Sequence, residues 1–310
     1  MSDADHTSGV DVAAELPVDK HFRLKEMLFD FFSSPIAAVS FLGVLLIVMC
    51  AALAPWIAPS NPYDLATVDV LDSRLEPGEQ SSMTDFIFVL GSDGIGRDIL
   101  SAIFYGLRTS LLVGVASGFI GFSIGSAVGL ISAYFGGRVD TIIMRIVDLQ
   151  LSFPTILIAL ILMASLGQGV DKIIFALVVA QWAYFARAIR GAALVERGKE
   201  YIEAAKSLGF SHTEIIRKHL LPNCLPPLIV IGTVQIAHAI ALEATLSFLG
   251  VGLPITEPSL GLLIANGFQY ILSGAYWISV YPGIALLLTV VSINLVGDRL
   301  RDILNPRLQR

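Results

Sequence analysis

The sequence predicts an all-α polytopic membrane protein with six transmembrane helices. Hydrophobic residues make up 55% of the 310 residues and charged residues only 15%, whereas soluble domains carry about a quarter charged residues. Apolar segments of about 20 residues are long enough to cross a hydrocarbon core of about 30 Å. Because a backbone in lipid must pair its polar groups internally, such segments are expected to be helices. The predicted spans are Ile36–Ala54, Ser110–Tyr134, Leu149–Leu166, Ile173–Ile189, Leu225–Leu249 and Ser279–Val296.

The distribution of Lys and Arg predicts that both termini lie in the cytosol. Cytoplasmic segments of membrane proteins are enriched in these residues. With the N-terminus inside, only Arg74, Arg97, Arg108 and Lys172 of the 20 Lys and Arg residues fall outside. The net charge of -6 leaves no dominant basic surface, so a nucleic-acid partner is not expected.

The N-terminal region has two parts with different compositions. Residues 1–22 are rich in acids and lack the basic start of a signal peptide, which predicts a disordered cytosolic tail. In residues 23–35, apolar side chains recur at helical spacing, which predicts an amphipathic elbow helix on the inner membrane surface. The stripe consists of Leu24, Met27, Leu28, Phe31 and Phe32.

Two further segments are predicted to lie outside. Residues 55–107 form a charged, proline-containing loop that is either simply solvated or in contact with an external partner. Residues 258–272 are apolar but too short to span, which indicates an interfacial or re-entrant helix. Two cysteines, Cys50 and Cys224, make neither a disulfide framework nor a zinc site and are expected to be small buried hydrophobic residues.

Five glycines in the second span form two small-xxx-small series. Gly114 and Gly118 make the first series, and Gly121, Gly125 and Gly129 make the second. Because glycine has no side chain, neighbouring helices can approach closely there. The sequence predicts helix packing at these positions, either inside the chain or against another subunit.

One acid, Glu243, lies well inside a predicted span, with His238 five residues before it. A charge at the bilayer centre costs at least about 2.5–3.5 kcal/mol, so its presence calls for a reason. One reading places Glu243 on a water-filled pathway or at a subunit interface. The other makes it a protonated or hydrogen-bonded packing carboxyl near the outer end of the span.

A long charged stretch, EYIEAAKSLGFSHTEIIRKHLLPN, interrupts the apolar runs at residues 200–223. Its first half is a good helix former, and Gly209 follows where a left-handed C-terminal cap is expected. Ser211 and Glu214 then have the spacing of a capping box. The pattern predicts two short helices at an angle beneath the membrane, before Pro222 and the next span. An ordinary helix connection of 2–8 residues would not need this length.

This stretch resembles the EAA signature of ATP-binding-cassette importer permeases, with a glycine after E-A-A and an L-P ending. The matching positions are Glu203, Ala204, Ala205, Gly209, Leu221 and Pro222. Residues 90–114 and the stretches LPNCLPPLIV and EATLSFLGVGLP resemble the dipeptide, oligopeptide and nickel branch. The resemblance runs from about residue 23 to the C-terminus, with Ser92 where threonine is usual and Leu260 where tryptophan is usual.

The resemblance implies a type I importer permease fold in the bacterial inner membrane. It implies an elbow helix at 23–35, a first span at 36–54, an external loop at 55–107, a permease domain at 108–298 and a cytosolic tail at 299–310. The coupling loop, residues 190–223, would dock on an ATPase. The residues expected to carry that coupling are Glu203, Ala204, Ala205, Gly209, Ser211, Glu214, Leu221 and Pro222.

The same resemblance implies partners and assigns the chemistry to them. The chain contains no G-x-x-x-x-G-K-[ST] phosphate loop, so ATP and Mg²⁺ are expected on partner subunits. We expect a permease rather than an enzyme, with no cofactor or metal of its own. The expected partners are a second homologous permease, two cytosolic ATPases, an external substrate-binding protein and membrane lipid.

The expected substrate is a di- or oligopeptide. Nickel or another small solute is the alternative within the family, although no His/Cys/Met cluster marks a metal path. An ion-coupled secondary transporter is the alternative from another class; it predicts inverted repeats and more intramembrane acids than the sequence shows.

Overall fold

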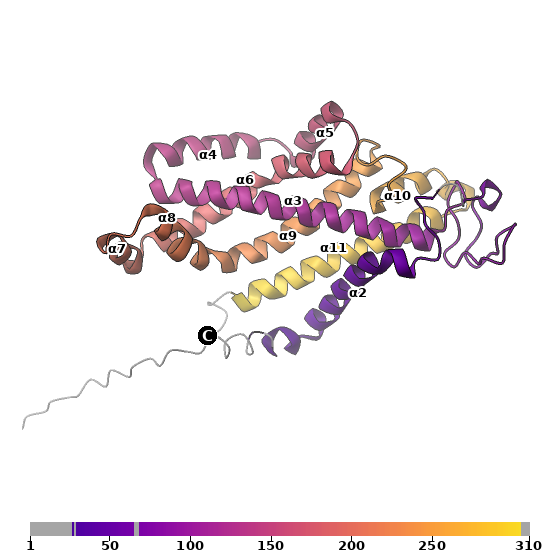
Figure 1. The fold of residues 1–310 in the computed structure, drawn as a ribbon, viewed down its shortest axis with the longest axis horizontal. Helices are drawn as coiled ribbons and strands as arrows, with labels where there is room; N and C mark the ends of the chain where they lie inside the picture. The colour runs from indigo at the N-terminus through magenta and orange to yellow at the C-terminus, as the bar shows by residue number, and fades with distance from the viewer. Residues whose placement is uncertain (1–26, 28, 65–67, 305–310) are drawn as a thin grey trace, which may run out of the picture.

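The computed structural model describes residue 27, residues 29–64 and residues 68–304, and these form an elongated bundle of helices (Figure 1). Residues 1–22, predicted to be a disordered tail, lie outside the described residues. So do Leu24 and Leu28 of the predicted elbow stripe. Residues 29–33 are helical, and the buried side chain of Phe31 packs with Ala37 and Ile303.

The helices follow one another along the chain with short connections, apart from the external segment between the first two. They are α2 (Pro35–Ile57), η1 (Val70–Asp72), α3 (Ile99–Phe135), α4 (Gly137–Leu151), α5 (Thr155–Leu166), α6 (Val170–Arg197), α7 (Glu200–Ser207), α8 (His212–Glu214), η2 (Ile215–Leu220), α9 (Leu221–Phe248), α10 (Leu260–Phe268), η3 (Ile271–Ser273) and α11 (Trp277–Leu304). Among the described residues, five helices are long and apolar enough to cross a membrane, or six if the bent pair α4 and α5 is one span.

The predicted third span, Leu149–Leu166, is not one helix. It straddles the end of α4 and all of α5, which are bent by 83° to one another. The cause is Pro154, which lacks a backbone N–H and disfavours helical backbone in the residue before it. α4 therefore ends at Leu151, and the chain restarts as α5, which has only 12 residues.

The predicted fifth span, Leu225–Leu249, starts much earlier than expected. Helix is continuous from His212 to Phe248, through the π-helical turn η2. Pro222 lies in the first turn of α9, directly after the π turn, a position where the missing N–H of a proline is tolerated. The side-chain N–H of Asn223 donates to the carbonyl of His219 at 2.6 Å.

The core of the bundle is α3, packed against α6 on one side and α9 on the other. A Cβ on Gly118 would lie 2.8 Å from Cγ1 of Ile236 in α9, and one on Gly125 would lie 2.6 Å from Cβ of Phe185 in α6. Gly114 also faces α9, and Gly121 and Gly129 also face α6. Both glycine series therefore pack within the chain.

Residues 258–272 contain α10, a short helix that lies between α9 and α11 (Figure 1). Ser259 caps it by accepting a hydrogen bond from the N–H of Leu262 at 3.2 Å. A Cβ on Gly261 would collide with the backbone of Ala244 in α9, so the helix approaches α9 closely. The final helix, α11, continues to Leu304, so residues 299–304 of the predicted tail are helical.

Candidate functional site

The segment at residues 190–223 projects from one end of the bundle as α7 and α8 (Figure 1). α7 ends in a Schellman motif around Gly209, whose φ is +77°. The N–H of Phe210 donates to the carbonyl of Ala205 at 3.2 Å, and the N–H of Gly209 donates to that of Lys206 at 3.0 Å. Only glycine adopts this left-handed backbone at no steric cost, so the chain reverses here.

The next helix begins with a complete capping box. The hydroxyl of Ser211 accepts a hydrogen bond from the N–H of Glu214 at 3.3 Å, and a carboxylate oxygen of Glu214 accepts one from the N–H of Ser211 at 3.2 Å. Glu214 also forms an ion pair with Lys218 at 3.1 Å. The two caps together fix the angle between α7 and the long helix that contains α9.

One side of the 190–223 segment is fastened to the bundle. Ile202 and Ala205 of α7 and Ile215 of η2 are buried in an apolar cluster with Leu130 of α3 and Ile189 of α6. Two polar contacts add to the attachment. The hydroxyl of Tyr134 lies 2.7 Å from Nδ1 of His212, and Arg197 donates to the carbonyl of Ala133 at 2.8 Å.

The other side of the segment is exposed and partly apolar. Leu208 is 77% exposed and Phe210 is 39% exposed at the tip, although both are large hydrophobic residues. Glu203 and Ala204 are exposed on α7, whereas Ala205 of the same motif is buried. Sequence reasoning missed Leu208 and Phe210; large apolar residues on both sides of a cap glycine were the available signal.

The positions of the remaining predicted residues differ. Gly209 and Ser211 are exposed at the tip, and Glu214 is half-buried. Leu221 and Pro222 lie away from the tip, in the first turn of α9, with Pro222 exposed and Leu221 half-buried. The matched motif therefore covers both the projecting tip and the base from which α9 enters the bundle.

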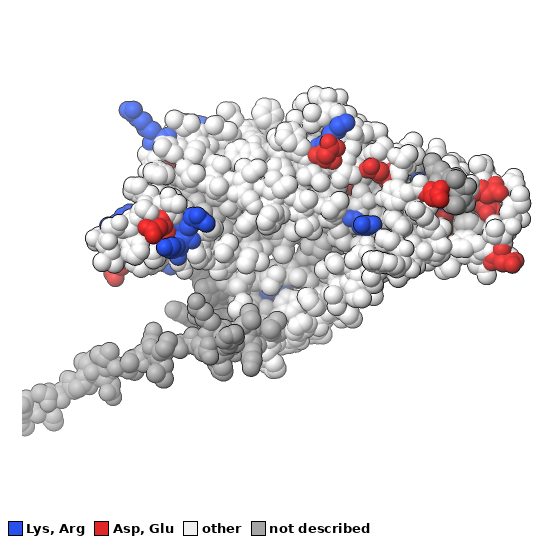
Figure 2. Space-filling model, in the orientation of Figure 1, with Lys and Arg blue, Asp and Glu red and all other residues white. Residues whose placement is uncertain are grey.

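Charge is distributed along the long axis of the molecule. Lys and Arg gather over α7 and α8 at one end, while Asp and Glu dominate the opposite end on the face shown (Figure 2). An enrichment of basic residues marks the cytosolic side of a membrane protein. This charge distribution favours a cytosolic position for the end with α7 and an external position for residues 58–98.

Glu243 is completely buried between α3, α9 and α10. Its two oxygens accept hydrogen bonds from the hydroxyls of Ser110 and Ser247, both at 2.8 Å. The hydroxyl of Ser110 in turn accepts a bond from the N–H of Leu260 at 3.4 Å. In the structure Glu243 therefore joins α3, α9 and α10 through hydrogen bonds near one end of α9.

His238 lies on a different side of α9 and is exposed. The structure does not bring it together with Glu243. Along with Pro227, Val234 and Thr245, it belongs to a face of α9 whose side chains are exposed, which we call the open face of α9. This face is flanked by α11 toward the cytosol and by α5 toward the outside, with cavities of about 730 Å³ and 350 Å³ along it.

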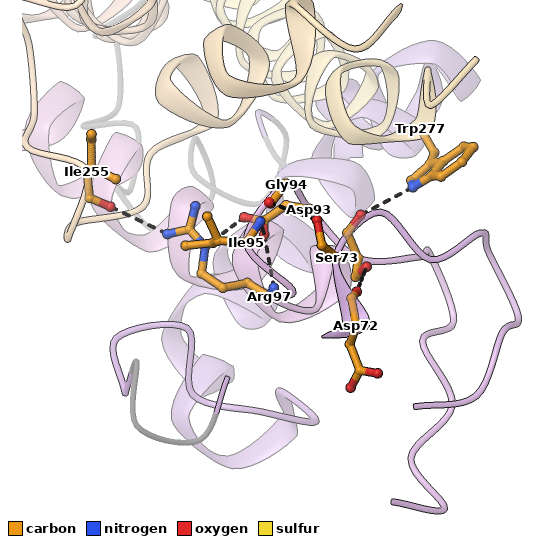
Figure 3. Close-up of polar contacts among 9 residues, drawn as sticks. Asp72, Ser73, Asp93, Gly94, Ile95, Arg97, Ile255 and Trp277 are labelled. Carbon is orange, nitrogen blue, oxygen red and sulfur yellow. Dashed lines mark hydrogen bonds and ion pairs between the residues drawn. The ribbon is translucent and has the colours of Figure 1, made fainter. Parts of the chain in front are cut away.

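The external segment, which we call the external cap (residues 58–98), is not simply solvated. Arg97 and Asp93 form an ion pair at 2.7 Å with side chains only 3% and 4% exposed. Arg97 also donates to the carbonyl of Ile255 at 3.4 Å, which ties the cap to the loop before α10 (Figure 3). The spacing of four residues between an acid and an arginine, among three glycines, was the available signal for this pair.

A second attachment joins the cap to α11. The indole N–H of Trp277 donates to the carbonyl of Ser92 at 3.3 Å (Figure 3). Ser92 is fully buried, and its hydroxyl accepts from the N–H of Leu75 at 2.7 Å and donates to the carbonyl of Asp72. The hydroxyl of Ser92 therefore joins two separate parts of the cap.

In the part of the chain that the structure describes, an all-helical bundle of five to six candidate spans with a segment projecting from one end is typical of polytopic membrane permeases. The chain belongs to the family described as binding-protein-dependent transport system inner membrane component, whose model matches residues 125–310. A second model, the N-terminal transmembrane domain of oligopeptide transport permease C, matches residues 23–77. The chain is therefore a multi-pass inner membrane permease, the non-enzymatic component of an ATP-binding-cassette transporter.

Curated relatives cover most of the chain. A putative peptide transport system permease protein of Brucella suis is 39% identical over 86% of this chain and 86% of its own length. The di/tripeptide transport system permease protein DppC of Pseudomonas aeruginosa is 36% identical over 92% of this chain and 93% of its own. An inward-facing structure of the MetNI methionine ABC transporter matches with a TM-score of 0.54 at 24% identity, covering 65% of this chain and 96% of that chain, which shows the fold.

Proposed function

We propose that this chain forms half of the translocation pathway of an importer for di- or oligopeptides. An external binding protein delivers the peptide, and a second homologous permease supplies the other half of the wall. The relatives that support a peptide substrate are named for peptide transport and align along most of the chain. Nickel or another small solute is the alternative substrate.

The observation that carries the coupling proposal is the tip of the 190–223 segment. An exposed leucine and phenylalanine on a cytosolic projection favour contact with another protein, because contiguous exposed apolar surface is rare without a partner. We assign this contact to one of two ATPase subunits, on which ATP and Mg²⁺ are bound. Glu203, on the same exposed side, would then pair with a basic or donor group of that ATPase.

The buried side of the segment connects movement of the tip to movement of the spans. Ile202, Ala205 and Ile215 pack against α3, α6 and the base of α9, so a displacement of the tip also displaces these helices. Ligands shift such an equilibrium only through different affinities for its two states. ATP binding and release on the partner would therefore move α9 and its open face between outward- and inward-open states.

The sharpest test of coupling uses Leu208→Asp. Leu208 makes few contacts inside the chain, so the variant is expected to fold while it loses co-purification with the ATPase and ATP-dependent peptide uptake. Leu272→Asp is the matched control, because Leu272 is 100% exposed at the external end. Undiminished assembly and uptake with Leu208→Asp would refute the docking assignment.

Glu203→Ala tests the polar part of the same contact. We expect weaker association with the ATPase, while Asp302→Ala, which removes an exposed acid at the end of α11, leaves association unchanged. Peptide uptake by the purified complex that requires a proton gradient and no ATP would instead favour an ion-coupled secondary transporter.

A further inference from the structure

The cavity of about 350 Å³ on the open face of α9 contains a cluster of uncharged polar side chains away from the ends of the spans. Its lining is Thr155, Ile156, His238, Ala241, Leu242 and Thr245. The hydroxyl of Thr155 lies 3.2 Å from that of Tyr184 in α6. Three helices, α5, α6 and α9, therefore contribute hydrogen-bonding groups to one place.

The depth of this cluster makes its composition unusual. Tyr184 is halfway along α6, and His238 is ten residues from the outer end of α9, or about 15 Å at 1.5 Å per residue. Most exposed side chains on the spans are large and apolar, as contact with lipid requires. Polar side chains at this depth are expected to face protein or a water-filled cavity, because burying them in hydrocarbon is costly.

A neighbouring ion pair indicates that this side of the bundle is in contact with water. Arg187 lies one turn beyond Tyr184 toward the cytosol and pairs with Asp148 of α4. The two side chains are 53% and 55% exposed, which lipid would oppose strongly. The polar stripe thus continues from the cavity toward the cytosolic end, as expected for the wall of a pathway.

We infer that Thr155, Tyr184, His238 and Thr245 form a subsite that binds the uncharged main-chain amide groups of a peptide in transit. This inference rests on the proposed peptide-import function. The hydroxyls of Thr155 and Tyr184 can each donate and accept, as can a neutral histidine ring through its two nitrogens, and the hydroxyl of Thr245, which donates to the carbonyl of Ala241, can still accept. A peptide group offers one donor and one acceptor, so the chemistry is complementary.

The cavity lining also explains what the subsite does not select. It contains no Asp, Glu, Lys or Arg, so it holds no fixed charge to bind a peptide terminus or a charged side chain. The nearby Arg187 and Asp148 neutralise each other. Recognition of main-chain amides allows peptides of different sequence to pass, which suits a pathway supplied by a separate binding protein.

The test uses the complete importer in proteoliposomes, with its partner permease, ATPases and binding protein. Thr155→Val and Tyr184→Phe keep the side-chain shape and remove the hydroxyls; each is expected to lower tripeptide uptake about fivefold, and the double variant about tenfold or more, in line with the loss of one hydrogen bond each. His238→Gln, which retains a donor and an acceptor, is expected to keep more uptake than His238→Leu.

Matched controls separate this effect from general damage. Thr141→Val removes the hydroxyl of an exposed threonine on α4 that, like Thr245, donates to the carbonyl four residues earlier. Tyr276→Phe removes an exposed hydroxyl near the outer end of α11. Both are expected to leave uptake unchanged.

A labelling experiment tests direct contact. In a background with Cys50→Ala and Cys224→Ala, His238→Cys is expected to react with a water-soluble thiol reagent in the assembled importer. Binding protein loaded with tripeptide, together with ATP, is expected to slow labelling at least threefold. A cysteine at Thr141 should show no such protection.

The outcomes distinguish this inference from the function on which it rests. Normal assembly, ATP hydrolysis and tripeptide uptake in Thr155→Val/Tyr184→Phe would overturn the subsite and leave the importer function intact. Loss of the second permease from the double variant would also overturn it, because the cluster would then be a subunit interface. Selective loss of Ni²⁺ uptake, with peptide uptake retained, would show that the subsite binds a metal ion rather than main-chain amide groups. Wild-type uptake without ATP would refute the proposed function itself.

Discussion

The external cap and the 190–223 segment lie at opposite ends of the molecule and are held by opposite means (Figure 1). The cap buries its charges: Asp93 and Arg97 are hidden, and the cap is bonded to the loop before α10 and to α11. The 190–223 segment buries aliphatic side chains such as Ile202 and exposes Glu203 and Leu208. A buried ionic network tolerates little displacement, whereas an exposed tip on a packed base is suited to be moved by a partner.

The largest effect is expected at the buried ion pair of the cap. Asp93→Leu should destabilise the folded cap by about 3–5 kcal/mol, because it removes the ion-pair partner of the buried Arg97. It also removes the acceptor for the N–H groups of Ile95 and Arg97, both at 2.9 Å. Hydrogen–deuterium exchange of residues 69–98 measures the loss.

Substitution of the other partner, Arg97→Met, is expected to destabilise the cap less, because the carboxylate of Asp93 still accepts hydrogen bonds from the backbone N–H groups of residues 95 and 97. Arg108→Ala, which changes an exposed arginine on α3, is the control. Equal protection of the cap amides from hydrogen–deuterium exchange in all three variants would show that the ion pair does not hold the cap in place.

A smaller effect is expected at the bend of the 190–223 segment. Gly209→Ala forces a side chain into a left-handed backbone, at a cost of about 1–2 kcal/mol. We expect faster exchange in α7 and reduced ATP-driven uptake, with the cap unaffected. Gly198→Ala is the control, because Gly198 has a φ of −79° and a Cβ there would meet its nearest neighbour at 3.8 Å. Identical behaviour of the two variants would mean that the bend does not depend on glycine.

A still smaller effect is expected at the capping box. Ser211→Ala removes the side-chain acceptor for the N–H of Glu214 and should destabilise the start of that helix by about 1 kcal/mol. Ser207→Ala, at an exposed position in the last turn of α7, provides the comparison. Exchange rates at residues 212–216 that do not differ between these variants would argue against a stabilising cap.

The same comparison explains what could be read from the sequence. The Schellman motif that ends α7 and the capping box are local, since their hydrogen-bond partners lie within five residues, and Gly209, Ser211 and Glu214 reveal them directly. The attachments of the external cap join residues far apart in the chain, such as Arg97 with Ile255 and Ser92 with Trp277, and no local pattern specifies them. The charged composition alone therefore left two alternatives, a solvated loop or a loop in contact with an external partner.

The helix breaks show the same limit in the membrane segments. Pro154 and Pro222 look alike in sequence, yet the chain bends by 83° around Pro154 and continues as helix through Pro222. Pro222 lies in the first turn of α9, directly after the π turn, where the missing N–H of a proline is tolerated, whereas Pro154 follows the end of α4. The identity of Ser110 as a hydrogen-bond partner of Glu243 likewise could not be predicted, because it depends on how α3 and α9 meet.

The smallest effect is a pH dependence that belongs to the cap alone. Burial acts to raise the pKa of Asp72, but hydrogen bonds from Ser81 and Ser82 outweigh it and place the pKa below the ordinary value of 3.8. A carboxyl with a lowered pKa stabilises the fold above its unfolded pKa, and this contribution is lost as the pH falls through the folded value. The cap should therefore lose stability as the pH falls below about 3.8, and Asp72→Asn should flatten this response.

Asp98 provides the opposite sign within the same cap. Burial raises the pKa of this carboxyl above 3.8, despite its two hydrogen bonds from Ser101. Its ionised form opposes folding above the raised pKa, so acidification relieves a cost there, and Asp98→Asn should steepen the acid-induced loss that Asp72→Asn reduces. Exchange of the cap amides measured against pH separates the two, because a common shift in the same direction would contradict opposite pKa changes. Variants in the 190–223 segment serve as the reference, since neither carboxyl contacts it.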